Sequence, residues 1–348
     1  METTLSVRAL NRAMLDRQML LERSRLSLTA VVERMGGIQN QYAPAGYIGL
    51  WSRMRAFERP MLTGALEERR LIQGTMMRGT IHVVSAADYW PMMAGIARVN
   101  REWFSKVQQR EIGDTDLDAV VEAVEQALAD GPLRFADLQA RLIARRFPAR
   151  AANWANFCMP MVRVPPSGTW ERRRADRYGL AGQWLPRVEV DEEDGIGHLV
   201  RRYLGAFGPA SLKDIAGWMG LNVGQMRHVA DGMELRRLRD EGGGPLVDLA
   251  DATLPDPDTP APPRFIAVWD AMLLVHARRT GLLPEAYRPH LFSTRIPQSV
   301  NSFLLDGQVA GSWRFEDGEI RLSPFRTLAA RERAALEEEA HRLAAFHT

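Results

Sequence analysis

The sequence predicts an α+β fold that is mostly helical, built from tandem winged-helix motifs and a small C-terminal β-element. Apolar residues recur at helical spacing in successive blocks, and each block ends in a short pair of predicted strands. A break at Gly131-Pro132 is repeated at Gly208-Pro209, each time before a helix that enters a helix-turn-helix pair. The 348 residues are too many for one winged helix and enough for several small domains packed together.

The first expected domain, residues 1–112, holds one winged helix and a connecting helix. Its helices are predicted at 28–35, 47–55 and 60–68, and its strands at 71–75 and 80–84. The turn of this wing is the basic pair Arg78-Gly79. The connecting helix is predicted at 86–109, with Ser85 as its N-cap.

The next two expected domains, residues 113–190 and 191–253, repeat the pattern. The second domain has predicted helices at 117–128, 135–146 and 151–162 and a wing hairpin at 168–178. The third has predicted helices at 196–207, 212–219 and 222–233 and a wing at 235–249.

The last expected domain, residues 254–348, begins with a linker rich in Pro and Asp. Its strands are predicted at 265–269, 302–305, 309–315 and 320–323, before a terminal helix at 329–346. Asp306-Gly307 and Asp317-Gly318 are typical of tight hairpin turns, so these strands are expected to pair in sequence.

Composition limits the class of protein. Hydrophobic residues at 46% and charged residues at 25% are typical of a soluble globular chain. The single cysteine, Cys158, excludes an internal disulfide and a cysteine-based zinc finger. No window has the length of an apolar membrane span, and the start of the chain lacks a signal-peptide pattern. We therefore expect a cytoplasmic protein.

Arginine carries nearly all of the positive charge, because lysine occurs only at positions 106 and 213. The formal net charge of +2 does not by itself indicate a nucleic-acid partner, and a GC-rich genome would also favour arginine. The predicted hairpin at 168–178 nevertheless carries four arginines: Arg172, Arg173, Arg174 and Arg177. On a two-stranded ribbon, Arg172 and Arg174 would share a face that could follow a phosphate backbone. The alternative is an exposed charged wing without a ligand.

Two further residues of the second domain could reach a groove of DNA. Arg150 and Asn153 occupy the position of a recognition helix in the predicted helix-turn-helix pair. An Asn on a helix surface is also often only solvated, so this alternative stays open.

The unusual polar segment is Gln39-Asn40-Gln41, which follows a helix ended by Gly36-Gly37. In an extended chain, Gln39 and Gln41 would point to the same side, and their amides could together orient a water molecule. A pair of glutamines is also common as ordinary surface polarity. No metal or cofactor is expected, because the seven His residues are scattered and no phosphate-binding glycine loop or nucleophilic serine motif occurs.

Several separated motifs in one order resemble a known family. They are MGGIQNQYAP at 35–44, YIGLW at 47–51 and MRGTIHVV at 77–84. The likeness continues through WERR at 170–173, VWD at 268–270 and DGQVAGSWR at 306–314. The chain resembles the winged-helix DNA-binding domain family that includes the AlkZ-type DNA glycosylases.

This resemblance implies winged helices around a concave DNA-binding surface and monofunctional hydrolysis of the N-glycosidic bond of alkylated purines in double-stranded DNA. The family's catalytic Gln-x-Gln motif maps onto Gln39 and Gln41. A sister branch has aspartate at the second position, so Gln41 places the chain in the Gln-x-Gln branch. The middle position is often apolar in the family and is Asn40 here. A monomer that works at the nucleoid, without a cofactor or a membrane, is expected.

Two amides suit only one kind of substrate. Alkylation at purine N7 or N3 makes the base a cationic leaving group, so the enzyme needs a positioned water rather than a strong acid or base. The resemblance further implies bulky or crosslinking adducts as substrates, and a hairpin that probes the duplex. The turn at 306–307 and the wing at 238–246 are both candidates for that probe.

Other residues are expected to contact DNA. Arg78 and His82 lie on the first wing, although His82 could equally be a buried core histidine. His276 and Arg279 follow Trp269-Asp270, and Asp270 could also cap the helix that begins there. The alternative function is a non-enzymatic winged-helix regulator of transcription, which the repeated units and the absence of a coiled-coil seam disfavour.

Overall fold

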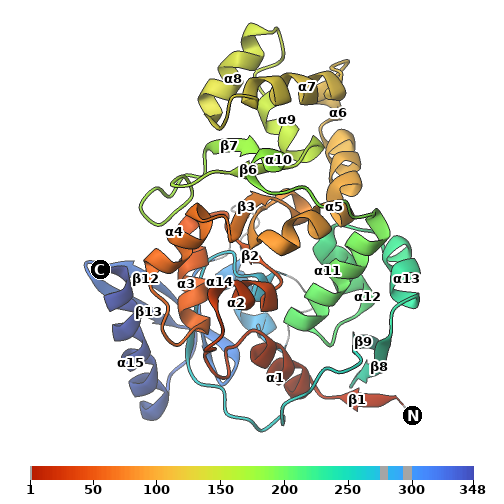
Figure 1. The fold of residues 1–348 in the computed structure, drawn as a ribbon. Helices are drawn as coiled ribbons and strands as arrows, with labels where there is room; N and C mark the ends of the chain where they lie inside the picture. The colour runs from red at the N-terminus through yellow and green to blue at the C-terminus, as the bar shows by residue number, and fades with distance from the viewer. Residues whose placement is uncertain (1, 275–280, 293–299) are drawn as a thin grey trace.

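The computed structural model describes residues 2–274, 281–292 and 300–348, and it confirms the mostly helical α+β fold (Figure 1). The first unit comprises α2 (Leu28–Arg34), β2 (Ile38–Gln39), α3 (Ala43–Arg53), α4 (Arg59–Glu67), β3 (Leu71–Thr75), the 3-10 helix η1 (Met77–Gly79) and β4 (Ile81–Ser85). It is followed by α5 (Ala86–Val107) and α6 (Gln109–Ile112). The Ser85 hydroxyl accepts a hydrogen bond from Asp88 N at 3.1 Å, which confirms Ser85 as the N-cap of α5.

The second and third units each contain three helices followed by two strands, and the second also has the short strand β5 and the short helix α10. The second comprises α7 (Leu117–Leu128), β5 (Leu133–Arg134), α8 (Phe135–Ala144), α9 (Ala151–Cys158), β6 (Met161–Arg163) and β7 (Arg177–Leu180), followed by α10 (Ala181–Trp184). The third comprises α11 (Glu192–Phe207), α12 (Leu212–Met219), α13 (Val223–Asp231), β8 (Leu235–Asp240) and β9 (Pro245–Leu249).

The C-terminal part is a β-sheet with a long helix beside it (Figure 1). Its elements are β10 (Arg264–Ile266), η2 (Ala271–Leu273), η3 (Glu285–Tyr287), α14 (Arg288–Leu291), β11 (Ser302–Leu305), β12 (Gln308–Glu316), β13 (Glu319–Pro324) and α15 (Ala330–His347). Asp306 and Gly307 have φ values of 45° and 79°, and Asp317 and Gly318 have 53° and 82°. These left-handed pairs confirm the two predicted hairpin turns.

The wings of the first two units form one six-stranded sheet with the order β2-β4-β3-β6-β7-β5. The sheet is joined by the antiparallel pairing of β3 with β6, which places Gln73 opposite Arg163 and Gly74 opposite Val162. In Figure 1 the helices α7, α8 and α9 stand on the far side of this sheet from α2 and α3. The short strand β2 therefore lies at an edge of a sheet that belongs to both units.

The start of the chain, which was not assigned regular structure from the sequence, packs on the third unit. β1 (Thr3–Leu5) pairs in parallel with β8, and α1 (Val7–Arg17) follows it. The Arg17 guanidinium donates two hydrogen bonds of 2.7 Å to the buried carboxylate of Asp248 on β9. The first residues of the chain are thus tied to the third wing, far away in sequence.

The predicted hairpin at 168–178 is wrong. β6 ends at Arg163 and β7 begins at Arg177, so the arginines between them lie in an irregular loop. Ser167 closes this loop, because its hydroxyl donates to Arg174 O and accepts from Asp176 N and Arg177 N. These side-chain bonds replace the ladder that a ribbon would need. Helix α9 also ends earlier than predicted, because Pro160 cannot continue it.

Among the residues in the three described ranges, no helix has the length and apolarity to cross a membrane. The same ranges contain no group of three or more His, Cys, Asp or Glu side chains that could hold a metal ion.

Candidate active site

The glutamine segment runs along the edge of the six-stranded sheet. Gly36 and Gly37, with φ values of 70° and 85°, end α2 in a left-handed conformation that glycine adopts without strain. β2 then pairs antiparallel with β4, which places Gln39 opposite His82. The pairing continues one step further, because Asn40 N donates to Ile81 O at 2.7 Å. This ladder fixes the backbone between the two glutamines.

Both glutamine side chains are anchored to the first wing through their carbonyl oxygens. Gln39 Oε1 accepts a hydrogen bond of 3.2 Å from Nη2 of Arg78. Gln41 Oε1 accepts a hydrogen bond of 3.1 Å from Ile81 N. Within the described ranges, neither amide nitrogen has a hydrogen-bond partner. Each amide therefore keeps two N–H donors and the second lone pair of its oxygen for another group.

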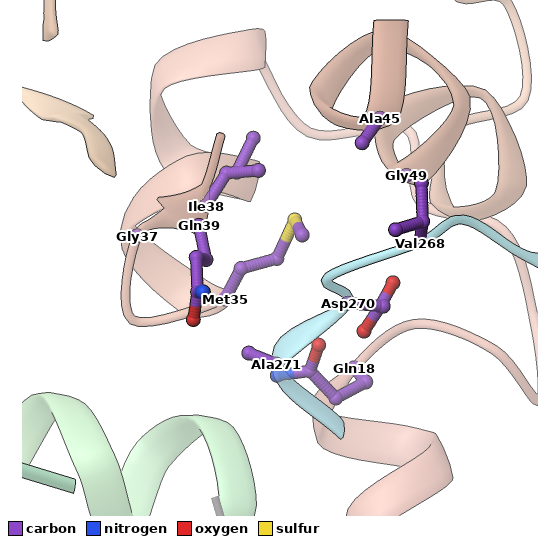
Figure 2. Close-up of a pocket in the computed structure, with 10 residues that line it drawn as sticks. All are labelled: Gln18, Met35, Gly37, Ile38, Gln39, Ala45, Gly49, Val268, Asp270 and Ala271. Carbon is purple, nitrogen blue, oxygen red and sulfur yellow. The ribbon is translucent and has the colours of Figure 1, made fainter. Parts of the chain in front are cut away.

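The two glutamines differ in exposure. Gln39 is only 5% exposed and lines a small pocket, whereas Gln41 is exposed to solvent. Figure 2 shows Gln39 and Met35 on one side of the pocket and Val268 and Asp270 on the other. The space in this pocket that the centre of a water molecule can occupy is about 10 Å³. This is room for about one water molecule and far too little for a nucleobase.

Arg78 connects the pocket to the third unit. Its φ of 54° turns the side chain inward, and Nη1 donates to Trp218 O on α12 at 2.6 Å. Burial lowers the pKa of Arg78. In the described part of the chain, no carboxylate lies within ion-pairing distance of its guanidinium. A partly buried positive charge therefore lies beside Gln39 without an opposite charge.

His82 is the buried core histidine that the sequence left as one alternative. It is 3% exposed, and its Nδ1 lies 3.0 Å from Thr80 O. Burial and the nearby charge of Arg78 lower the pKa of His82 to about 3, so the ring is neutral near neutral pH. A neutral, buried ring does not present the surface cation that a phosphate contact requires.

Asn40 is buried between the glutamines and fixes the start of α3. Its Oδ1 accepts a hydrogen bond of 3.1 Å from Gly46 N, and the side chain is 2% exposed. A Cβ at position 46 would lie 2.7 Å from this oxygen, so glycine is needed there. Within the described residues, Asn40 Nδ2 is buried without a hydrogen-bond partner. The side chain of the middle residue of the motif thus positions the backbone at the start of α3.

Asp270, on the opposite wall, is an N-cap and an ion-pair partner at once. Its Oδ1 accepts from Met272 N at 3.1 Å, which confirms the capping alternative. The carboxylate also receives hydrogen bonds of 2.9 and 3.0 Å from the fully buried guanidinium of Arg53. Gln18 Oε1 accepts from the same guanidinium at 3.1 Å. Arg53 and Gln18 were missed from the sequence, because nothing local distinguishes a buried arginine from an exposed one.

Comparisons with known proteins identify the family. The family model described as "DNA glycosylase AlkZ-like" matches residues 32–346, which is most of the chain. The chain belongs to the AlkZ-like DNA glycosylase family. It is therefore a DNA glycosylase rather than a non-enzymatic regulator.

One curated relative and one solved structure extend this comparison. The chain is 24% identical to the "Interstrand DNA cross-link repair glycosylase" of Streptomyces sahachiroi, across 95% of this chain and 93% of the relative. The solved structure of the Streptomyces sahachiroi DNA glycosylase AlkZ matches with a TM-score of 0.84 and 22% identity. That match covers 99% of this chain and 97% of the other. The AlkZ-like fold thus spans the whole described molecule.

The expected DNA contacts of the second unit lie at the surface of this AlkZ-like chain. Arg150 is 65% exposed at the start of α9 and pairs with Glu111, and Asn153 is exposed on the same helix. Arg172, Arg174 and Arg177 are also exposed. Because they lie in or next to the irregular loop, the predicted sharing of one ribbon face by Arg172 and Arg174 does not hold.

Arg173 is the one arginine of this loop that reaches the glutamine segment. Its Nη1 donates to the hydroxyl of Tyr42 at 3.0 Å, and Tyr42 directly follows Gln41. The structure thus brings one loop arginine next to the first unit, whereas Arg150 and Asn153 stay with α9. His276 and Arg279, the other two expected contacts, lie outside the described residues.

The two candidate probes differ in their contacts. The Asp306 carboxylate pairs with Arg8 and Arg12 of α1, and Gly307 O accepts a hydrogen bond from Asn11 at 2.8 Å. This turn is held against α1. At the tip of the third wing, Glu241, Gly242 and Gly243 are exposed. The Glu241 carboxylate nevertheless accepts a hydrogen bond of 3.1 Å from Val7 N, so both candidate probes contact the start of the chain.

Proposed function

We propose that this chain is a monofunctional DNA glycosylase that hydrolyses the N-glycosidic bond of cationic N7- or N3-alkylated purines, with Gln39 and Gln41 as its catalytic residues. The observation that carries the proposal is the anchoring of both amide oxygens on the first wing, with both amide nitrogens unpartnered in the described structure. One short segment then supplies two neutral dipoles, each held by a bond to its carbonyl oxygen. Such dipoles stabilise developing charge without the cost of reorientation.

The proposed reaction balances without a strong acid or base. The bond between C1′ and the purine nitrogen breaks, and its electron pair neutralises the positive charge of the alkylated base. A water molecule adds to the oxocarbenium-like sugar, and its proton leaves to solvent because a carboxamide does not take it up near neutral pH. Gln39 and Gln41 hold the water and the sugar in position.

The positions of the two lysines support the monofunctional assignment. Lys106 and Lys213 are the two lysines of the chain, and both are exposed on helices away from the pocket lining. A strand-cleaving glycosylase that uses a lysine would need such an amine at the sugar.

The small size of the pocket is compatible with bulky substrates that stay outside it. A volume for about one water does not admit a purine, so the damaged base is expected to stay outside it while the water is held inside. The name of the Streptomyces relative refers to repair of interstrand DNA cross-links. We therefore include crosslinking adducts among the proposed substrates.

The proposed DNA contacts are the exposed arginines and the unpaired cation at the site. Arg78 lies beside Gln39 without a carboxylate in the described chain, and a DNA phosphate would supply the missing negative charge. Exposed residues of the second unit would contact the backbone or a groove: Arg150, Asn153, Arg172, Arg173, Arg174 and Arg177.

The test is base excision from duplex DNA with a single N7-methylguanine, followed by detection of the abasic site. The double variant Gln39→Ala, Gln41→Ala is expected to lose at least about 100-fold in single-turnover rate, since oriented donors contribute that much in other sites. Gln183→Ala, an exposed glutamine on α10, is the matched control and is expected to act as wild type. Equal rates for wild type and the double variant would contradict the proposed roles. Strand cleavage without heat or alkali would contradict the monofunctional assignment.

A further inference from the structure

A half-exposed aromatic ring lies directly beside the proposed catalytic residues. Tyr42 follows Gln41 and is 42% exposed. It is the N-cap residue of α3, but its side chain makes no capping hydrogen bond. Its hydroxyl receives a hydrogen bond of 3.0 Å from Arg173. The guanidinium carbon of Arg173 also lies 6.0 Å from the centre of the Tyr42 ring. The ring is therefore held at the surface rather than free to rotate.

Arg173 is itself braced by a buried anchor. Its Nε donates to Trp170 O at 3.4 Å, and its guanidinium lies 5.8 Å from the Trp170 ring. Trp170 is 8% exposed and packs edge-on against Tyr47 at 5.7 Å. The loop between β6 and β7 thus reaches from the second unit to the first and fixes an exposed aromatic ring and a cation together.

The charge of Arg173 is not neutralised within the described protein. No carboxylate of the described residues lies within 4.0 Å of its guanidinium, although Arg174 of the same loop does have such a partner in Asp176. Arg172 and Arg174 add further exposed positive charge next to it. An aromatic ring beside exposed cations is the arrangement that proteins use to stack a base and hold its phosphate.

We propose that Tyr42 and Arg173 form a DNA-contact site for the nucleotide next to the damaged one. The Tyr42 ring stacks on a base that has lost its neighbour, and Arg173 binds the adjacent phosphate. The site separates the damaged sugar from the duplex stack and presents it to the glutamines. This inference rests on the proposed roles of Gln39 and Gln41 only for its place in the reaction.

The test measures binding to a duplex that carries a tetrahydrofuran abasic analogue, which the enzyme cannot turn over, and to the undamaged duplex. Tyr42→Ala is expected to raise Kd for the abasic duplex about ten-fold, with a much smaller change for undamaged DNA, since only the gap offers an unstacked base. Tyr42→Phe keeps the ring and is expected to stay within about three-fold of wild type. Arg173→Ala is expected to raise both Kd values and to lower the slope of log Kd against log salt by about 0.9.

Arg187→Ala is the matched control for charge, because Arg187 is an exposed arginine in the linker before α11. Its Kd values for both duplexes are expected to stay near those of wild type. Thermal unfolding of each variant separates a folding defect from a contact. Tyr42→Ala binding to the abasic duplex with wild-type affinity would overturn the inference. An equal loss on both duplexes together with a lowered Tm would also overturn it, by assigning Tyr42 a structural role. Excision by the double variant Gln39→Ala, Gln41→Ala, compared with wild type, tests the glutamines separately, so the two failures are distinguishable.

Discussion

At the scale of single residues, the buried charge of Arg78 shapes its neighbours. It polarises the Gln39 carbonyl through a hydrogen bond, and it helps to keep His82 neutral. The site therefore combines two neutral amides with the Arg78 cation, and the Asp270 carboxylate across the pocket is paired with Arg53. This arrangement has separate consequences for stability and for catalysis.

His82 is expected to make the fold sensitive to acid. The pKa of this histidine is about 3 in the folded chain and about 6.5 when unfolded, so the unfolded state binds more protons between these values. The free energy of unfolding should fall as pH drops below about 6.5, by up to about 1.4 kcal/mol per pH unit from this group. Denaturant unfolding at several pH values measures the slope.

The variant His82→Asn keeps a donor for Thr80 O and removes the titrating ring. Its unfolding free energy should depend less steeply on pH between about 4 and 6 than that of wild type. Identical slopes for the two proteins would show that His82 is not the group responsible.

Asn40 is expected to act as a positioning residue. Replacing it by alanine removes the acceptor for Gly46 N, which should cost about 1 kcal/mol of stability, as loss of a helix cap does. Because the start of α3, directly after the glutamine segment, is then less constrained, the single-turnover rate should fall while Kd for DNA stays near wild type. A lower stability with an unchanged rate would limit Asn40 to a structural role.

The sequence named the two glutamines as candidates but not the long-range contacts around them. Gln39 and Gln41 were found because they lie close together in a family motif. Arg53 and Asp270 are 217 residues apart, and Arg78 and Trp218 are 140 apart. Such contacts depend on how the units pack, which local spacing does not encode.

At the scale of elements, local sequence patterns were sufficient to predict the bounds of elements that have clear capping residues and apolar periodicity. Helices α7 and α12 and strand β3 have the predicted bounds, because capping residues and apolar periodicity mark them. The loop between β6 and β7 was misread as a ribbon. The charged residues of this loop lie at the alternating spacing that is typical of a strand. The Ser167 side chain, however, makes the hydrogen bonds to Arg174 O and Asp176 N that a partner strand would otherwise make.

The ion pair between α1 and β9 is expected to be essential for the fold. Asp248→Asn leaves the Arg17 guanidinium, which is 7% exposed, without its negative partner. Breaking a buried pair from one side typically costs about 3–5 kcal/mol. Thermal or denaturant unfolding should show this loss, and the double replacement Arg17→Met, Asp248→Leu should recover part of it. A loss below about 1 kcal/mol for Asp248→Asn would contradict this role.

At the scale of the whole molecule, units that are separate in sequence share one sheet and one core. The largest hydrophobic cluster takes residues from α1, α5, α11 and the C-terminal sheet. The sequence indicated the repeated units, and the pairing of β3 with β6 emerged only in three dimensions. The sequence of a strand such as β3 does not indicate which other strand will pair with its edge.

The excision rate is expected to be independent of pH between about 6 and 8. Both proposed catalytic groups are amides, and His82 stays neutral across this range. Single-turnover rates at saturating enzyme, measured on N7-methylguanine DNA, check this expectation. A bell-shaped profile with an inflection inside the range would indicate a titrating acid or base that the proposed mechanism lacks.

The pairing of β3 with β6 also restricts how this protein can be recombined with its relatives. Each of these strands contributes half of a backbone ladder, so a chimaera with a crossover between Thr75 and Met161 joins two edges that did not evolve together. A mismatch there leaves unpaired strand edges open to other chains. Crossovers placed after Leu180 keep the six strands from one parent, and libraries of AlkZ-like chimaeras should be divided at that point.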